Sequence, residues 1–151
     1  MTSLPHYLRD LPDFPHDDLH TTCIHASHIC PHFSSIQGSI EDHIHKLGSN
    51  EAMVQQHAAG ALWNLALNND NKDKIAAAGA IPPLVALLGP QSSSGVQQHA
   101  AGALWNLALN NDNNKVKIRS AGGVAALTQL MESTTDMVSK RLAKIALDNL
   151  K

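Results

Sequence analysis

The sequence predicts an all-helical solenoid, a fold in which short helical units stack side by side around a shared core. The main observation is a repeat: the 18 residues from Val54 to Asn71 return unchanged from Val96 to Asn113, 42 positions later. A repeat of this length is typical of units that cannot bury their own apolar faces and therefore stack. In addition, the 151-residue chain is 43% hydrophobic but only 3% aromatic. Its core must therefore be built from small aliphatic side chains, which let helices approach closely.

The repeated segment has the pattern of a buried helix. At 100° per residue, Val54, Ala58 and Leu62 lie on one broad apolar side, and Trp63 lies on the opposite flank. A narrow strip between them carries His57, Gly60 and Asn64 in the first copy and His99, Gly102 and Asn106 in the second. A helix that is apolar nearly all round is usually buried. We therefore expect neighbours on both flanks, with the strip lining a groove.

The elements of the first unit follow from local signals. Order is expected to begin near residue 38, and apolar residues at helical spacing place a helix over 40–47. Gly48 and Ser49 should turn the chain, and Asn50 is expected to cap a longer helix over about 51–68. This longer helix contains the first copy of the repeated segment.

In the second unit, a loop over 68–72 should lead to a short helix over about 73–78 that ends at Gly79, a typical left-handed stop. Pro82 and Pro83 suit the first turn of the next helix, which ends at Gly89. The second copy of the long helix then covers about 96–110. In the third unit the spacing becomes 43 because one extra residue follows Asn113. The last helix, over about 135–150, is charged and is expected to cap the array.

The run Ala-Ala-Gly-Ala-Leu-Trp-Asn-Leu-Ala, followed by Lys74-Ile75 and by the segment Ala78 to Leu88, resembles the armadillo repeat of the catenins and importin-alpha. The resemblance covers roughly residues 38–151. It implies a right-handed superhelical solenoid of about three units, near 36–71, 72–113 and 114–151, within a domain over 36–151. In this family each unit has a short first helix, a second helix, and a longer third helix that lines a concave face.

The resemblance also implies a function. Asn64, Asn106 and Asn149 recur once per unit and would form a ladder along the groove. A carboxamide donates and accepts hydrogen bonds, and importin-alpha-like proteins use such an asparagine to hold the backbone of an extended peptide. We therefore expect a non-enzymatic scaffold or adaptor whose partner is a protein or an extended peptide. Pockets beside the ladder would be shaped by His57, Gly60, His99, Gly102, Leu142 and Ile145, and the glycines are expected to leave room for side chains of the partner.

The chain departs from the importin-like pattern in one respect. Those grooves carry a tryptophan one turn before the asparagine, where this chain has Gly60, Gly102 and Ile145. Trp63 and Trp105 instead come directly before the asparagine, on the flank that should meet the adjacent unit. They are expected to pack between units. Because no acidic row accompanies the asparagines, basic localisation signals are not the favoured ligands.

Residues 1–35 contain four prolines and no sustained apolar period, so they are predicted to be a disordered tail. Zinc ligands in proteins are typically Cys and His, and the tail carries such residues closely spaced. The candidates are Cys23, His25, His28, Cys30 and His32. Their spacing is unlike the two separated pairs of a structural zinc site. Incidental enrichment is therefore favoured, and a metal-binding regulator stays an alternative.

Other function classes find little support. The sequence lacks a phosphate-binding glycine loop, a nucleophile signature and paired carboxylates on one face, so neither enzyme activity nor a cofactor is expected. The net charge of −2 gives no footprint for nucleic acid. No apolar run is long enough to span a membrane and no signal peptide is evident, which favours an intracellular protein of the cytoplasm or nucleus. A further alternative is a fragment-like repeat protein that self-associates end to end or stacks on another armadillo protein.

Overall fold

The computed structural model describes residues 38–151, and within this range the chain forms eight helices and no strands. The prediction of an all-helical fold is therefore confirmed. The predicted disorder of residues 1–35 lies outside the described residues and stays a prediction. The helices are α2 (Ile40–Leu47), α3 (Ala52–Leu65), α4 (Asn69–Ala77), α5 (Ile81–Ala86), α6 (Ser94–Ala108), α7 (Asp112–Ser120), α8 (Gly123–Ser133) and α9 (Met137–Asn149).

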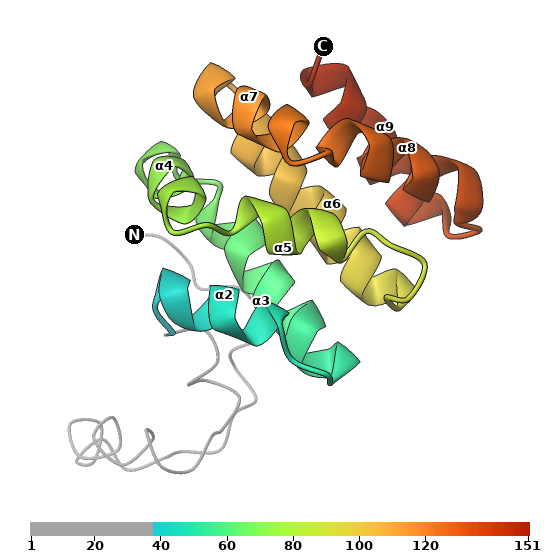
Figure 1. Cartoon of the computed structure of the whole chain (residues 1–151), viewed down its shortest axis with the longest axis horizontal. Coiled ribbons are helices and arrows are strands. Elements are labelled where there is room, and N and C mark those ends of the chain that lie inside the picture. The colour runs from blue at the N-terminus through green and yellow to red at the C-terminus, as the bar shows by residue number, and fades with distance from the viewer. Residues whose placement is uncertain (1–37) are drawn as a thin grey trace, which may run out of the picture. The chain divides into compact units, whose positions relative to one another are not determined.

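The helices form three sets in which equivalent members of successive units are neighbours (Figure 1). The short first helices are α4 and α7, the second helices are α2, α5 and α8, and the long third helices are α3, α6 and α9. Within the third set, α6 packs against α3 on one flank and against α9 on the other. This side-by-side stacking of helical units is the predicted solenoid.

The core runs continuously through the units and is built from Ala, Leu, Ile and Val, as the composition predicted. Its largest fully buried side chains include Leu62, Leu84, Leu104 and Leu127, one or more from each unit. Both tryptophans are only partly buried and pack against this cluster. The repeated small residues of α3 and α6 let these two helices approach closely, which sets the packing of the candidate site.

Helix α2 begins and ends where the sequence predicted. Ser39 caps it by accepting a hydrogen bond from the Asp42 amide at 3.2 Å, while the Asp42 carboxylate accepts from the Ser39 amide at 3.1 Å. The prediction that Asn50 caps α3 is wrong. The residue before α3 is Glu51, whose side chain makes no cap, and Gln55 instead reaches back to donate to the Ser49 carbonyl at 2.7 Å.

The predicted loop over 68–72 is also wrong, because α3 ends at Leu65 and α4 already begins at Asn69. Asn68 caps α4 by accepting from the amides of Asp70 at 2.8 Å and Asn71 at 3.4 Å. The predicted stop at Gly79 is confirmed, since this glycine has φ 85°. The two prolines lie in the first turn of α5, as predicted.

The extra residue of the third unit is absorbed just after α6. Asn110 adopts a left-handed conformation with φ 55°, which asparagine tolerates better than most residues. The cap then moves on by one residue, and Asn111 accepts from the Asn114 amide at 3.0 Å to start α7. The two copies of the repeated segment therefore have the same letters but different ends.

Candidate functional site

The residues predicted to line a groove lie on the three third helices. We call them the third-helix strip: His57, Gly60 and Asn64 on α3, His99, Gly102 and Asn106 on α6, and Asn149 on α9. Because α3, α6 and α9 are neighbours in that order, the strip crosses one unit after another. Equivalent positions of the strip nevertheless differ in burial and in hydrogen bonding.

The three asparagines have different environments. Asn64 is exposed, and its carboxamide makes no hydrogen bond to another described residue. Asn106 is 3% exposed and donates from Nδ2 to the backbone carbonyl of Trp63 at 3.0 Å. Asn149 donates to the carbonyl of Ile145 within its own helix at 3.0 Å. Only Asn64, of these three, offers its whole carboxamide to a ligand.

The end of α3 explains the role of Asn106. The last carbonyls of a helix have no partner within the helix, and α3 ends two residues after Trp63. Asn106 of the next unit supplies the missing donor. Helix α6 runs one residue further by comparison, so the carbonyl of Trp105 accepts from the Leu109 amide at 3.0 Å. The Trp105 carbonyl therefore already has a donor, and Asn149 donates instead within α9, to the Ile145 carbonyl.

The expectation that the glycines leave open pockets is wrong. A Cβ atom added to Gly102 would lie 2.5 Å from the indole of Trp63, so this ring already fills the space. A Cβ atom on Gly60 would lie 3.0 Å from the ring of His99. The rings of Trp63 and His99 meet edge to face, with centroids 5.8 Å apart and planes at 76°. The prediction that Trp63 packs against the adjacent unit is confirmed.

His99 is held in place from its own helix. Its Nδ1 donates to the carbonyl of Gly95, one turn earlier, at 2.6 Å. Trp63, which lies next to the strip, and His99, which belongs to it, are both partly exposed and form an aromatic pair between α3 and α6. Trp105 is likewise partly exposed on α6. The strip and the tryptophans beside it therefore offer aromatic surface and one open carboxamide.

The sequence analysis missed a second set of asparagines that joins first helices to third helices. Asn71 donates to the carbonyl of Leu65 at 3.2 Å, and Asn114 donates to the equivalent carbonyl of Leu107 at 3.2 Å. Lys72 is buried beside them and donates from Nζ to the carbonyl of Leu109 at 2.7 Å. Asn71 and Asn114 keep their register at the 43-residue spacing, which was the signal available in the sequence.

One histidine outside the strip is buried. His43 of α2 is 2% exposed, and neither ring nitrogen has a well-formed hydrogen-bond partner among the described residues. Burial lowers the pKa of His43, and the nearby Lys46 lowers it further. The ring is therefore held neutral within the first unit, far along the chain from any candidate ligand. We assign it no part in the site.

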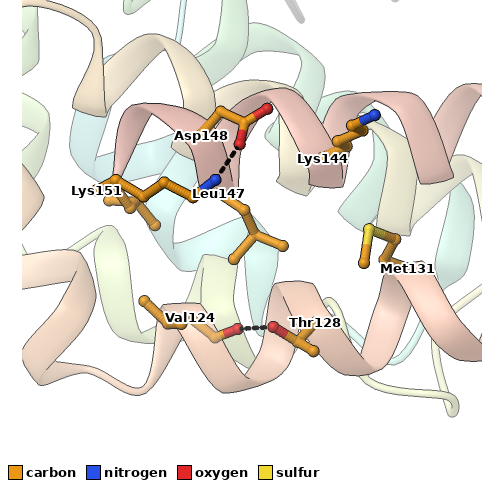
Figure 2. Close-up of a pocket in the computed structure, with 8 residues that line it drawn as sticks. Val124, Thr128, Met131, Lys144, Leu147, Asp148 and Lys151 are labelled. Atoms are coloured by element: carbon orange, nitrogen blue, oxygen red, sulfur yellow. Dashed lines mark hydrogen bonds and ion pairs between the residues drawn. The ribbon is translucent and has the colours of Figure 1, made fainter.

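One pocket lies at the other end of the array, between α8 and α9 (Figure 2). It has a volume of about 410 Å³ and is lined mostly by apolar side chains. Helix α9 contributes Lys144 and Asp148, and Lys151 follows the end of this helix. Asp148 accepts an ion-paired hydrogen bond from Lys151 at 2.6 Å, which lowers the pKa of the Asp148 carboxyl. This pocket does not belong to the third-helix strip.

Residues 38–151 contain no group of three or more His, Cys, Asp or Glu that could hold a metal ion. None of the helices in this range is long and apolar enough to cross a membrane. The metal-ligand candidates of the tail lie outside the described residues: Cys23, His25, His28, Cys30 and His32.

The sequence matches the model of one protein family. A model of the armadillo/beta-catenin-like repeat matches residues 68–109, a stretch that includes α4, α5 and α6. No curated protein matches the chain. The structural matches below are to engineered or designed proteins.

An engineered protein solved by the Northeast Structural Genomics Consortium is 34% identical with a TM-score of 0.70, and the match covers 74% of this chain and 46% of that one. A designed armadillo repeat protein in complex with the peptide (KR)4 is 30% identical with a TM-score of 0.68, and the match covers 74% of this chain and 46% of that one. A structure of computationally designed armadillo repeat proteins for modular peptide recognition is 31% identical with a TM-score of 0.69, and the match covers 74% of this chain and 47% of that one.

The chain thus spans less than half the length of these solved structures. Another designed armadillo repeat protein is 30% identical with a TM-score of 0.69, and the match covers 74% of this chain and 47% of that one. Together with the match to the family model, these findings show that the chain is an armadillo-repeat protein.

Proposed function

We propose that the chain is a non-enzymatic scaffold or adaptor that binds an extended segment of a partner protein across the third-helix strip. The observation that carries this proposal is Asn64, an exposed carboxamide on the strip with no hydrogen bond to another described residue. Similar designed proteins support the proposal, since one is described in complex with the peptide (KR)4 and others as made for modular peptide recognition.

The chemistry of the strip suits the backbone of an extended peptide better than a particular charge. Asn64 can donate to a peptide carbonyl and accept from a peptide amide at the same time. Trp63 and His99 lie beside it as partly exposed rings that can cover apolar side chains. Asn106 contributes indirectly, because its bond to the Trp63 carbonyl holds the end of α3 against α6.

The expected affinity follows from the size of the strip. Packed helices lie about 8–10 Å apart, and an extended peptide advances about 3.3 Å per residue. Each unit therefore spans roughly three peptide residues, and three units span roughly nine. Such a footprint is well below a standard protein interface, so an isolated peptide should bind weakly, with a Kd of roughly micromolar or poorer.

A selection from a random peptide library, followed by affinity measurement, tests the proposal. Peptides selected on the parent chain should lose about fivefold or more in affinity for Asn64→Ala, because one good hydrogen bond contributes about 1 kcal/mol. The matched control is Asn113→Ala, which removes an exposed asparagine from α7, outside the strip. If Asn64→Ala and Asn113→Ala bind the selected peptides as the parent does, Asn64 is not a contact and the proposal fails.

A further inference from the structure

A core position of the second helices carries a histidine in the first unit and a leucine in each of the other two. His43 stands five residues after Gly38, and the equivalent residues, five after the glycine that precedes α5 and α8, are Leu84 and Leu127. All three side chains are buried: His43 is 2% exposed, and both leucines are 0% exposed. Of the three, only the imidazole of His43 can take up a proton near neutral pH.

The surroundings of His43 are those of a core side chain. Both ring nitrogens are buried without a well-formed hydrogen-bond partner among the described residues, whereas a leucine would leave no polar atom unpaired. The backbone of Gly38 closes over one edge of the ring, because a Cβ atom added there would lie 3.2 Å from Cε1 and 3.3 Å from Nε2. Solvent therefore reaches the ring nitrogens only when α2 or the segment at Gly38 moves away.

The environment of the ring favours its neutral form. Burial lowers the pKa of His43 most, and Lys46, one turn further along α2, lowers it as well. Asp42 and the Gly38 backbone act on this pKa in the opposite direction but do not outweigh these two effects. Helix α5, which packs against α2, carries no titratable side chain. The other titratable groups of α2, of α3 and of the turn between them are exposed: Glu41, His45, Glu51 and His57.

Helix α2 is held mainly by its contacts with α3 and α5 (Figure 1). It has eight residues, and a helix of this length is not stable on its own in water. Its apolar side packs into the core through three residues: Ile40, Ile44 and Leu47. Helix α3 has a separate attachment to the next unit, because the Trp63 ring lies on Gly102 and Asn106 donates to the Trp63 carbonyl. The release of α2 therefore leaves the contact between α3 and α6 in place.

We propose that His43 makes the first unit a pH-sensitive switch, in which protonation of the ring in mildly acidic solution releases α2 from α3 and α5. The docked ring does not keep the proton, since the charged imidazolium would lie in the core instead of in water. Once α2 is released, water hydrates the imidazolium and the apolar sides of α2 and α3 become exposed. Units 2 and 3 carry leucine at this position and keep their second helices docked. This switch is separate from the peptide contact proposed at Asn64.

The size of the effect follows from the two protonation equilibria of the ring. In the released state the ring has the ordinary histidine pKa of about 6.5, and in the docked state its pKa is lower. The equilibrium constant for release is therefore nearly constant above about pH 6.5 and rises by up to about tenfold per pH unit below it, until the docked ring also titrates. Between pH 7.5 and pH 5.5 it should increase severalfold, and at most about tenfold.

Hydrogen exchange on the full chain measures this release helix by helix. Protection factors, which correct for the pH dependence of the intrinsic exchange rate, are compared at pH 7.5 and pH 5.5. Those of the α2 amides should fall severalfold in the parent, while those of the α6 amides should stay the same. His43→Leu gives the first unit the residue of the other two and should remove this fall, as should His43→Phe. The matched control is His45→Leu, which replaces an exposed histidine of the same helix and should keep the fall.

The ring itself provides a second readout by NMR. In the parent, the His43 ring should stay mostly neutral at about pH 6.5, where an ordinary histidine is half protonated, and a half-protonated ring there would overturn the proposal. The proposal is also overturned if the protection of α2 in the parent is the same at both pH values, or if the folded His43 variants lose it as the parent does. Equal loss of protection in α2 and α6 would overturn it as well, because protonation would then unfold the array as a whole.

Discussion

Replacing Asn106 and Asn64 separately by alanine should have different effects on stability, although both lie in the same 18-residue sequence. Asn106 is 3% exposed and donates to the Trp63 carbonyl at 3.0 Å. Removing it leaves a carbonyl at the end of α3 without a donor, which costs about 1–3 kcal/mol. Asn64 makes no such bond, so Asn64→Ala should cost nothing on this account.

Comparing Asn106→Ala with Asn64→Ala cancels the effect of the substitution on helix propensity. Alanine is a better helix former than asparagine by about 0.6 kcal/mol, and this gain applies equally to α3 and α6 because the surrounding letters are the same. The difference between the two variants therefore isolates the contact between units. It should amount to about 1–3 kcal/mol, or roughly 4–12 °C in the thermal midpoint of a domain of this size.

Urea unfolding followed by circular dichroism measures this difference, with thermal melts as a second readout. Asn106→Ala should unfold at lower urea than the parent, and Asn64→Ala should unfold at the same or slightly higher urea. Equal free energies of unfolding for the two variants would show that the Asn106–Trp63 contact contributes nothing. The packing of α3 on α6 would then have to be reconsidered.

Three further outcomes follow from the packing. Gly102→Ala should lower the free energy of unfolding by about 1–3 kcal/mol, because its Cβ meets the Trp63 ring at 2.5 Å. Gly60→Ala should lower it less, because its Cβ meets only the edge of the His99 ring at 3.0 Å. Thermal melts of the two variants check this difference. Trp63→Ala should cost about 3 kcal/mol in urea unfolding, the low end for a large aromatic since the ring is partly exposed, and a loss below about 1 kcal/mol would place the ring at the surface. The pKa of His43 is lowered in the folded state, so the free energy of unfolding should be at its full value above the ordinary histidine pKa of about 6.5 and should fall as the pH drops below it. In thermal melts at a series of pH values, His43→Phe should remove this fall.

Much of the fold could be predicted from the sequence, because repetition and strong local signals agree. The identical copies set the unit length, and Gly79 and Pro82 mark helix boundaries that the structure confirms. The helix ends next to asparagine runs could not be placed as well. In Asn68-Asn69-Asp70-Asn71 several residues can cap a helix, and the two copies of this run choose different caps, Asn68 and Asn111.

The candidate site was harder to predict for a physical reason. Asn64 and Asn106 have the same sequence neighbours, so no local pattern can distinguish them. What differs is the preceding third helix, which covers α6 but not α3. The same holds for the glycines: their small size was visible in the sequence, but the tryptophan that fills the space beside Gly102 comes from 39 positions away.

Mapping a library-selected peptide onto the chain by NMR tests the proposed function most directly. On titration of the labelled parent, the largest amide and indole shift changes should fall on α3 and α6, at Asn64, Trp63 and His99, and smaller changes should appear at Trp105, which lies beside the strip on α6. The same titration of Asn64→Ala should need about fivefold more peptide for the same change. Shift changes confined to the first helices α4 and α7, or to the pocket between α8 and α9, would contradict a binding site on the third-helix strip.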